Sequence, residues 1–147
     1  MKKIIYLFVL GLFAACSNEP QPIDYGNDNC DFCEMTIVSQ AYSAQAVSQK
    51  GKQYKYDAIE CMLNDQLQHN YDMAVNLVAD FEQPGTMIDV HKAGFVINDS
   101  IKSPMGGNLA AFKKESSVVK DASEGTFSWE GLETHFLQTD SLPISHQ

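Results

Sequence analysis

The sequence predicts an α+β domain of two related, small ββα-type halves whose sheets are mainly antiparallel. Short runs of β-branched and aromatic residues, each bounded by turn residues, recur along most of the chain, which is typical of strands joined by hairpins. Helical periodicity is confined to short segments that follow such pairs of runs. A weak internal echo supports two halves, because Met35 and Met105 each open a segment with a strand, a Gly turn, an aromatic strand and a helix with acidic residues at its start.

The N-terminus has the pattern of an export signal. Two lysines precede an apolar run over residues 4–13, which is too short to span a bilayer as a helix and has the length of a signal-peptide core. The small residues before Cys16 resemble a lipobox, in which the cysteine is acylated and becomes the first mature residue. Residues 1–15 are therefore expected to be a signal peptide, and the polar residues 16–29 a lipidated flexible tether. An ordinary secreted protein is the alternative.

The folded domain is expected over residues 30–138, with halves at about 30–81 and 86–138, and residues 139–147 are expected to be a frayed tail. Strands are predicted at residues 35–39 with a loose continuation over 41–48, and at 53–56, 73–81, 86–90, 94–97, 109–112 and 126–129. Helices are predicted at residues 58–68, 113–122 and 130–138.

The helix over residues 58–68 has the clearest pattern. Asp57 is expected to be its N-cap, with Glu60 completing a capping box three residues later. Cys61 lies near the start of this helix, where the helix dipole favours a thiolate. One face of the helix would carry its apolar residues, Ile59, Met62, Leu63 and Leu67.

The composition argues against several functions. The formal net charge is −9, and all ten basic residues are lysine. Such a chain is a poor nucleic-acid binder, because neutralising phosphates requires clustered positive charge. No segment resembles a Ser-His-Asp constellation, a phosphate-binding loop or a paired-carboxylate site, so a hydrolase is not indicated. The chain is not predicted to be an enzyme, although one alternative below is an oxidoreductase.

A dense group of sulfur ligands lies at residues 30–35. Cys30, Cys33 and Met35 fall within six residues, and Cys61 with Met62 repeats the pairing. Thiolate and thioether ligands select Cu(I), zinc or iron–sulfur clusters over hard cations. If Cys16 is acylated, three cysteines remain, and an odd number outside the cytosol cannot all form disulfides within the chain. At least one thiol is then free or metal-bound.

Three interpretations of the Cys-x-x-Cys spacing stay open. A thiol–disulfide oxidoreductase of thioredoxin type needs the motif at a strand-to-helix junction, whereas a strand is predicted after Cys33. A zinc-stabilised interaction module needs four ligands, which Cys30, Cys33, Cys61 and His69 would supply. A Cu(I) site accepts low coordination and takes a thioether readily, which makes Met35 a ligand candidate.

Other sulfur and imidazole side chains are further candidates. Met105 lies between Pro and Gly-Gly in a predicted exposed loop, where a thioether is not easily explained as core. Met62 and Met73 are more often core residues than ligands. His91 and His135 are expected at the surface, although either could reach a site. His146 lies in the predicted tail and is not a candidate.

Four motifs occur in order along the chain: Cys30-x-x-Cys33-x-Met35, Lys52-x-Tyr54-x-Tyr56-Asp57-x-Ile59-Glu60-Cys61-Met62, Asp89-x-x-Lys92-Ala93-x-x-Val96 and Pro104-Met105-Gly106. Together they resemble the NosL family, lipoproteins associated with nitrous oxide reductase assembly, over about residues 28–138. There are two departures from the family pattern. Glu34 stands where the family usually has Gly, and Gly107-Asn108-Leu109 stands where it commonly has His-Glu-Leu, so a His ligand from the second half has no match.

The resemblance implies two related ββα-containing halves and a Cu(I)-binding chaperone that passes copper to an apo-enzyme outside the cytoplasm. By position it maps ligands to Cys30, Cys33, Met35 and Met105, and Cys61 is a further candidate metal ligand. We therefore expect a protein anchored to a bacterial membrane through acylated (palmitoylated) Cys16, on the side facing away from the cytoplasm. Its partner would be an exported copper enzyme such as nitrous oxide reductase. Zinc as the metal, and a homodimer sharing one metal ion, are open alternatives.

Overall fold

The computed structural model describes residues 18–121 and 125–140. The strands, in chain order, are β1 (Ala44–Ser48), β2 (Gln53–Tyr56), β3 (Met73–Ala79), β4 (Met87–Asp89), β5 (Ala93–Ile97), β6 (Leu109–Lys113) and β7 (Thr126–Phe127). The helices are α2 (Ile59–His69), the 3₁₀-helix η1 (Val90–Lys92), α3 (Ser117–Asp121) and α4 (Trp129–Asp140). No described helix has the length and apolar character needed to cross a bilayer.

The first sheet is antiparallel and has the strand order β2-β1-β3-β4. A tight turn joins β1 to β2, and Gly51 takes a left-handed φ of 80° there, a conformation that glycine adopts without steric penalty. Along β2 the side chains alternate in burial, so that Tyr54 and Tyr56 are buried while Gln53 and Lys55 are only partly buried. This alternation places both tyrosines on one face of the sheet.

The second sheet is also antiparallel and has the order β6-β5-β7. It joins the first sheet at one point, where Asp80 forms a parallel bridge with Ala111 and the amide of Phe81 donates to the carbonyl of Ala111 at 2.9 Å. The two sheets together confirm the predicted α+β class with antiparallel pairing.

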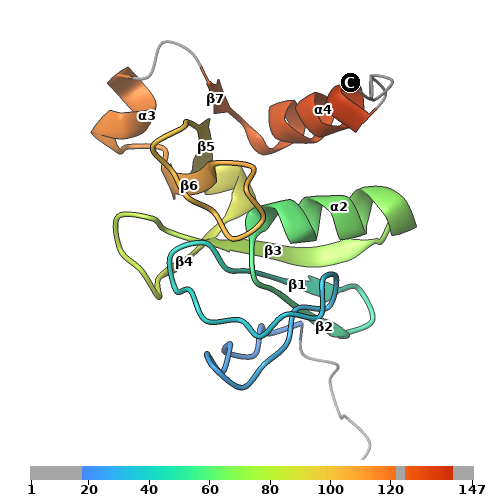
Figure 1. Ribbon diagram of the computed structural model, residues 1–147. Coiled ribbons are helices and arrows are strands. Elements are labelled where there is room, and N and C mark those ends of the chain that lie inside the picture. Colours follow the sequence, from blue (N-terminus) through green and yellow to red (C-terminus); the bar gives the residue numbers. More distant parts are fainter. Residues whose placement is uncertain (1–17, 122–124, 141–147) are drawn as a thin grey trace, which may run out of the picture.

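Helix α2 lies between the two halves of the domain. In Figure 1 it sits above the first sheet, beside β6 and below α4, and it contacts β1, β2, β6 and α4. Its first turns are therefore buried almost all around: Ile59, Glu60, Cys61, Met62, Leu63 and Asp65. The apolar members join one core with residues of both sheets, and this central position brings the chemistry of α2 into contact with both halves.

Both halves share a strand–strand–helix–strand order. In each sheet the first strand is central, with its hairpin partner on one side and the strand that follows the helix on the other, which gives β2-β1-β3 and β6-β5-β7. Two details of the prediction are wrong. Strand β4, predicted within the second half, pairs with β3 in the first sheet. The Gly51 turn joins the hairpin β1–β2, and the matching hairpin in the second half is β5–β6. The counterpart of the Gly51 turn is therefore the long β5–β6 connection, not the predicted turn at Gly125.

The segment before β1 differs most from the predictions. The strand predicted at residues 35–39 does not form, and only Thr36 makes an isolated bridge, with Asn29. Ile37 pairs instead with the preceding segment, since its carbonyl accepts from Gly26 at 2.8 Å. Packing also begins earlier than the predicted tether allows, because Ile23 is buried in the core. At the other end, α4 continues two residues into the predicted tail, to Asp140.

The predicted N-terminal cap of α2 is wrong. Ala58 is the N-cap, and no side chain accepts a capping hydrogen bond there. The two acidic residues assigned to the capping box serve other contacts, described below. The carboxylate of Asp57 accepts from the backbone of Val38, and that of Glu60 accepts from the hydroxyl of Ser103.

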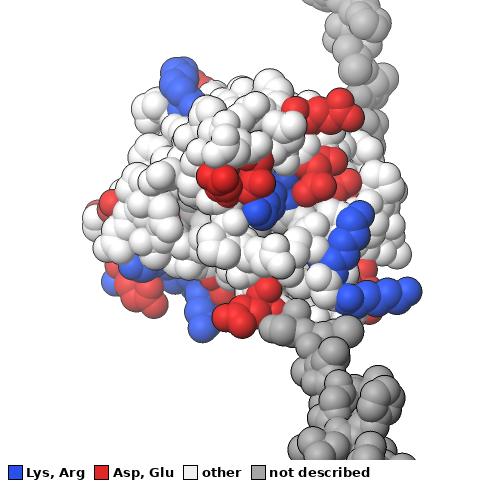
Figure 2. Space-filling view, turned by 90° about the horizontal axis from the view of Figure 1, so that it is seen from below, with Lys and Arg blue, Asp and Glu red and all other residues white. Residues whose placement is uncertain are grey.

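The surface carries mixed charge. Figure 2 shows one face of the molecule, on which Lys side chains lie next to Asp and Glu among uncharged residues. That face has no continuous basic patch of the kind that nucleic-acid binding requires.

Candidate metal centre

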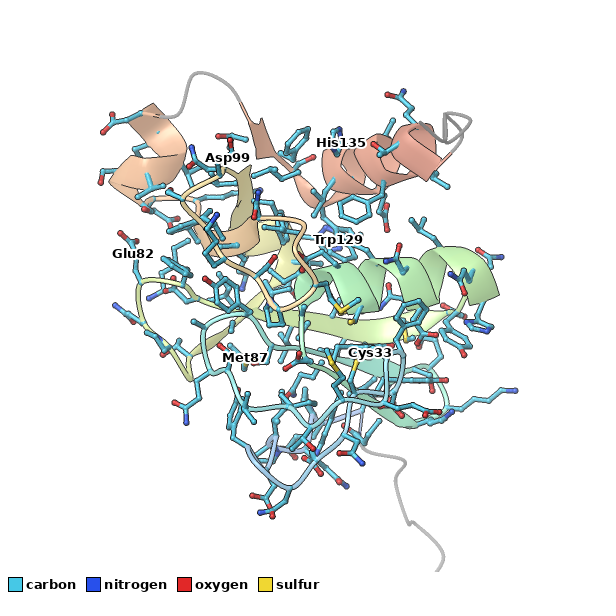
Figure 3. All side chains as sticks on the ribbon, in the orientation of Figure 1. Cys33, Glu82, Met87, Asp99, Trp129 and His135 are labelled. Carbon is cyan, nitrogen blue, oxygen red and sulfur yellow. The ribbon has the colours of Figure 1, made fainter. Side chains whose placement is uncertain are left out.

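Three thiols from two separate segments converge. The sulfur atoms of Cys30, Cys33 and Cys61 all lie within 4.8 Å of one another, and this is the one such group of His, Cys, Asp and Glu side chains in the part of the chain that the structure describes. Cys30 and Cys33 belong to a loop before β1, and Cys61 belongs to the first turn of α2. Figure 3 shows Cys33 below α2, where the loop faces the helix.

A tight turn sets the spacing of the first two thiols. The amide of Cys30 donates to the carbonyl of Met35 at 2.8 Å, and the amide of Glu34 donates to the carbonyl of Cys30 at 3.0 Å. Glu34 closes this turn with a left-handed φ of 63°. The amide of Cys33 then lies 3.5 Å from the sulfur of Cys30.

The loop is held against the free edge of β2. The amide of Asp31 donates to the carbonyl of Lys55 at 2.9 Å, and the amide of Lys55 donates to the Asp31 carboxylate at 2.6 Å. These bonds satisfy backbone groups that an edge strand would otherwise expose. The Lys55 ammonium also pairs with Asp28 at 2.5 Å, and its hydrogen bond lowers the pKa of that carboxyl group. Strand β2 leads directly into α2, so this contact aligns the loop with Cys61.

The three thiols differ in exposure. Cys30 and Cys61 are 2% and 0% exposed, whereas Cys33 is only partly buried. All three are free thiols. The group therefore has two sulfurs in the protein interior and one sulfur at its solvent edge.

The three thiols differ in acidity. The thiol of Cys61 donates a hydrogen bond to Cys30, and with the nearby amides of Cys33, Asp57 and Phe32 it lowers the pKa of Cys30 to about 5. The same hydrogen bond, together with burial, raises the pKa of Cys61, and burial raises the pKa of Cys33. The sequence had favoured Cys61 as the thiolate because of the helix dipole. The structure favours Cys30, because the contact with Cys61 lowers the pKa of Cys30 and raises that of Cys61.

Asp57 is a neighbour of the site that the sequence prediction missed. It is 3% exposed, and its Oδ1 atom has no hydrogen-bond partner among the described residues. Burial and the charge of Cys30 both raise the pKa of its carboxyl group. A carboxyl group beside a thiolate disfavours a second negative charge at the site. The position of Asp57 between an aromatic strand and an apolar helix was a signal that its side chain could be buried. The capping pattern of the sequence instead predicted a helix cap at this residue.

The methionine candidates lie at different depths. Met35 and Met105 are 46% and 40% exposed, so both residues lie at the surface. Met35 directly follows the turn that carries the thiols, and Met105 lies in the connection between β5 and β6. Met62 is fully buried in the core, as expected for a core residue, and Met73 is packed against it.

None of the three histidines that the structure describes joins the thiols. His69, the predicted fourth zinc ligand, is bound through Nδ1 to the Asp65 carboxylate at 2.9 Å and stacks on Tyr71. His91 lies 3.1 Å from Glu130, and His135 packs against Phe127. His146 and the predicted lipidation site, Cys16, lie outside the described residues.

The donor set suits a soft metal ion. Three sulfurs within reach of one ion match Cu(I), which is stable with two or three soft ligands. A closed structural zinc site requires a fourth ligand, and no described His, Cys, Asp or Glu supplies one. A thioredoxin-type pair is also disfavoured, because a turn and an extended segment, not a helix, follow Cys33.

Comparisons with known proteins identify the fold and the family. The chain is similar in structure to the crystal structure of the copper chaperone NosL from Shewanella denitrificans, with a TM-score of 0.62 and 18% sequence identity, over 78% of this chain and 95% of that chain. No curated relative matches the sequence. The family model of NosL matches residues 22–124, which is most of the chain and includes all three thiols. The chain therefore belongs to the NosL family.

Proposed function

We propose that this protein is a Cu(I) chaperone that binds the ion at Cys30, Cys33 and Cys61 and passes it to an acceptor. The convergence of three free thiols within 4.8 Å carries this proposal. It is supported by family membership and by the structural likeness to a protein described as a copper chaperone. The role is binding and transfer, without a catalysed reaction.

The uneven exposure of the thiols suits transfer. Two buried sulfurs hold the ion away from water, while Cys33 at the solvent edge is where an acceptor's ligand can approach. In the exchange a bond forms between the ion and the incoming sulfur or nitrogen, one bond to a cysteine breaks, and the freed thiolate takes up a proton. The ion remains Cu(I) throughout. The exposed thioethers of Met35 and Met105 are further ligands in the proposal.

The proposed acceptor is an exported copper enzyme such as nitrous oxide reductase. An acyl chain on Cys16 would hold the chaperone at a bacterial membrane, on the side facing away from the cytoplasm. Support for this part comes from the leader of the sequence and from the family resemblance.

An anaerobic Cu(I) titration against a competing chelator tests the binding function. The protein is the reduced, detergent-solubilised full chain with Cys16→Ser, which removes the lipidation cysteine and its thiol. We expect tight binding of one ion per chain, weakened strongly by Cys30→Ser or Cys33→Ser and more weakly by Met35→Leu. A ratio of one ion per two chains would indicate a shared site. Unchanged affinity in Cys30→Ser and Cys33→Ser, or zinc binding in a parallel titration without Cu(I) binding, would contradict the proposal.

A further inference from the structure

Glu60 is a buried acidic residue that joins the two halves of the domain. It directly precedes Cys61 on α2 and is 3% exposed. Its Oε1 atom accepts a hydrogen bond from the hydroxyl of Ser103, in the β5–β6 connection, and its Oε2 atom has no partner within the described chain. Burying a carboxylate with one oxygen unpaired lowers the stability of the fold, which indicates that Glu60 has a role other than stabilising the domain.

The β5–β6 connection is shaped around this carboxylate. The hydroxyl of Ser103 also lies 3.4 Å from the amide of Leu109, which closes the connection across its base. A Cβ atom at Gly107 would lie 2.7 Å from Oε1 of Glu60, so the absence of a side chain there lets the backbone approach the carboxylate. The amide of Gly107 contributes a hydrogen bond to Glu60. Glu60 is thus held by residues on both sides of the tip of the connection.

The tip between these two contacts carries Met105. Ser103 and Gly107 each lie two residues from it, and the amide of Gly106 donates back to the carbonyl of Ser103 at 3.0 Å, which makes the tip a tight turn. The thioether projects at 40% exposure. Ser103 and Gly107 both contact the side chain of Glu60. The residue after Glu60 on α2 is Cys61, whose thiol belongs to the candidate metal site.

We propose that Glu60 is a positioning residue, which fixes the Met105 thioether relative to the Cys30, Cys33 and Cys61 thiols. This inference rests on the proposed function and adds how a ligand from the second half is placed against the thiols of the first. Glu60 does not itself bind the ion. It ties the Ser103–Gly107 turn to α2, so that Met105 and Cys61 move as one unit.

A double-mutant cycle on Cu(I) affinity tests this role. We expect Met105→Leu to weaken Cu(I) binding about tenfold, and Ser103→Ala or Glu60→Leu to weaken it by a similar factor, in the range found when residues that orient metal ligands are removed. Combining either change with Met105→Leu should add little, because Glu60 acts only through the thioether. Glu60→Gln keeps an acceptor for Ser103 and should stay close to the parent protein.

Asp65→Asn is the matched control, because Asp65 is another buried acidic residue of α2 but contacts Tyr56 and His69 instead of the connection. It should leave Cu(I) affinity unchanged even if it lowers stability. If Glu60→Leu does not fold, Ser103→Ala removes the same contact from the loop side. Full affinity in Ser103→Ala, additive effects in the double mutant, or no effect of Met105→Leu would each overturn the positioning role. None of these results affects the chaperone proposal, which fails only if the parent chain does not bind Cu(I) through its cysteines.

Discussion

The sulfur atoms of Cys30 and Cys61 lie within 4.8 Å of each other, and both residues are almost completely buried. Cys61 is fixed on a helix and Cys30 on a loop, so this contact joins the two segments that build the site. Without a cation, like charges this close disfavour ionisation of more than one thiol. A bound metal ion removes that restriction and displaces the remaining protons, which links metal binding to pH.

In the reduced, metal-free protein, Cys30 should be the first thiol to ionise. We expect an apparent pKa of about 5, the value to which the Cys61 hydrogen bond lowers it. The measurement is a titration of thiolate ultraviolet absorbance in the full chain with Cys16→Ser. Cys30→Ser should abolish this first transition and leave only transitions at higher pH. A first transition that persists in Cys30→Ser would assign the thiolate to another residue.

The stability of the metal-free protein should depend on pH in the same range. Folding lowers the pKa of Cys30, so its ionised form stabilises the fold fully above the unfolded value of about 8.5. That contribution is lost as the pH falls through about 5. Urea unfolding should therefore show a decrease in stability between about pH 8 and pH 5 that is smaller in Cys30→Ser. Equal decreases in the two proteins would contradict the assignment.

Asp31→Ala should weaken the attachment of the thiol loop to β2. The change removes the 2.6 Å hydrogen bond between the carboxylate and the Lys55 amide. We expect a loss of about 1 kcal/mol in the free energy of unfolding, measured by urea denaturation. Cu(I) affinity should also fall, because the loop would no longer hold Cys30 and Cys33 against Cys61.

Glu82→Ala is the control for this change, since the Glu82 side chain is exposed and remote from the thiols along the chain. It should alter neither stability nor affinity. If Asp31→Ala lowered stability and left Cu(I) affinity at the parent value, the loop contact would be structural only.

Much of the fold could be predicted from local patterns. The β1–β2 hairpin and α2 follow from alternation, from the Gly51 turn and from helical periodicity, and they appear within a few residues of the predicted bounds. What failed depends on contacts that lie outside these local patterns. The segment around Ile37 has strand-forming residues, but its hydrogen bonds go to residues 26–28 and not to a sheet. Tertiary context of this kind is invisible to local propensity.

The candidate site was predictable in its chemistry but not in its assembly. Sulfur spacing singled out Cys30 and Cys33, and the repeated pairing added Cys61. Asp57 and Glu60 were wrongly predicted to cap α2, because their spacing matches a capping box although neither side chain makes a capping hydrogen bond. Only the structure shows that one carboxylate contacts Val38 and the other Ser103, 43 residues away in sequence from Glu60.

Glu34→Gly should stabilise the protein. Glu34 has a left-handed φ of 63°, which is unfavourable for a residue with a Cβ atom. Glycine adopts this conformation freely but loses more entropy on folding, so we expect a net gain of about 0.5–1 kcal/mol in the free energy of unfolding. The departure from the family pattern at this position therefore has a cost in backbone strain.

Urea unfolding of Glu34→Gly and Glu34→Ala distinguishes backbone strain from loss of the side chain. Alanine retains the strained φ, so Glu34→Ala should be no more stable than the parent. A similar gain in both variants would attribute the effect to removing the charged side chain beside the thiols.

Removing metal should leave the domain folded. Cys30 and Cys61 lie in the core, but most of that core is apolar and comes from both sheets and α2, including Tyr56, Leu63 and Phe95. Bound Cu(I) should raise Tm by mass action, and chelation should lower it again while the circular dichroism spectrum and the cooperative transition persist. A zinc-dependent module would instead unfold on chelation, because its metal supplies the folding free energy. The control is Cys33→Ser, whose Tm should respond much less to Cu(I), since the change removes a ligand at the solvent edge and leaves the core intact.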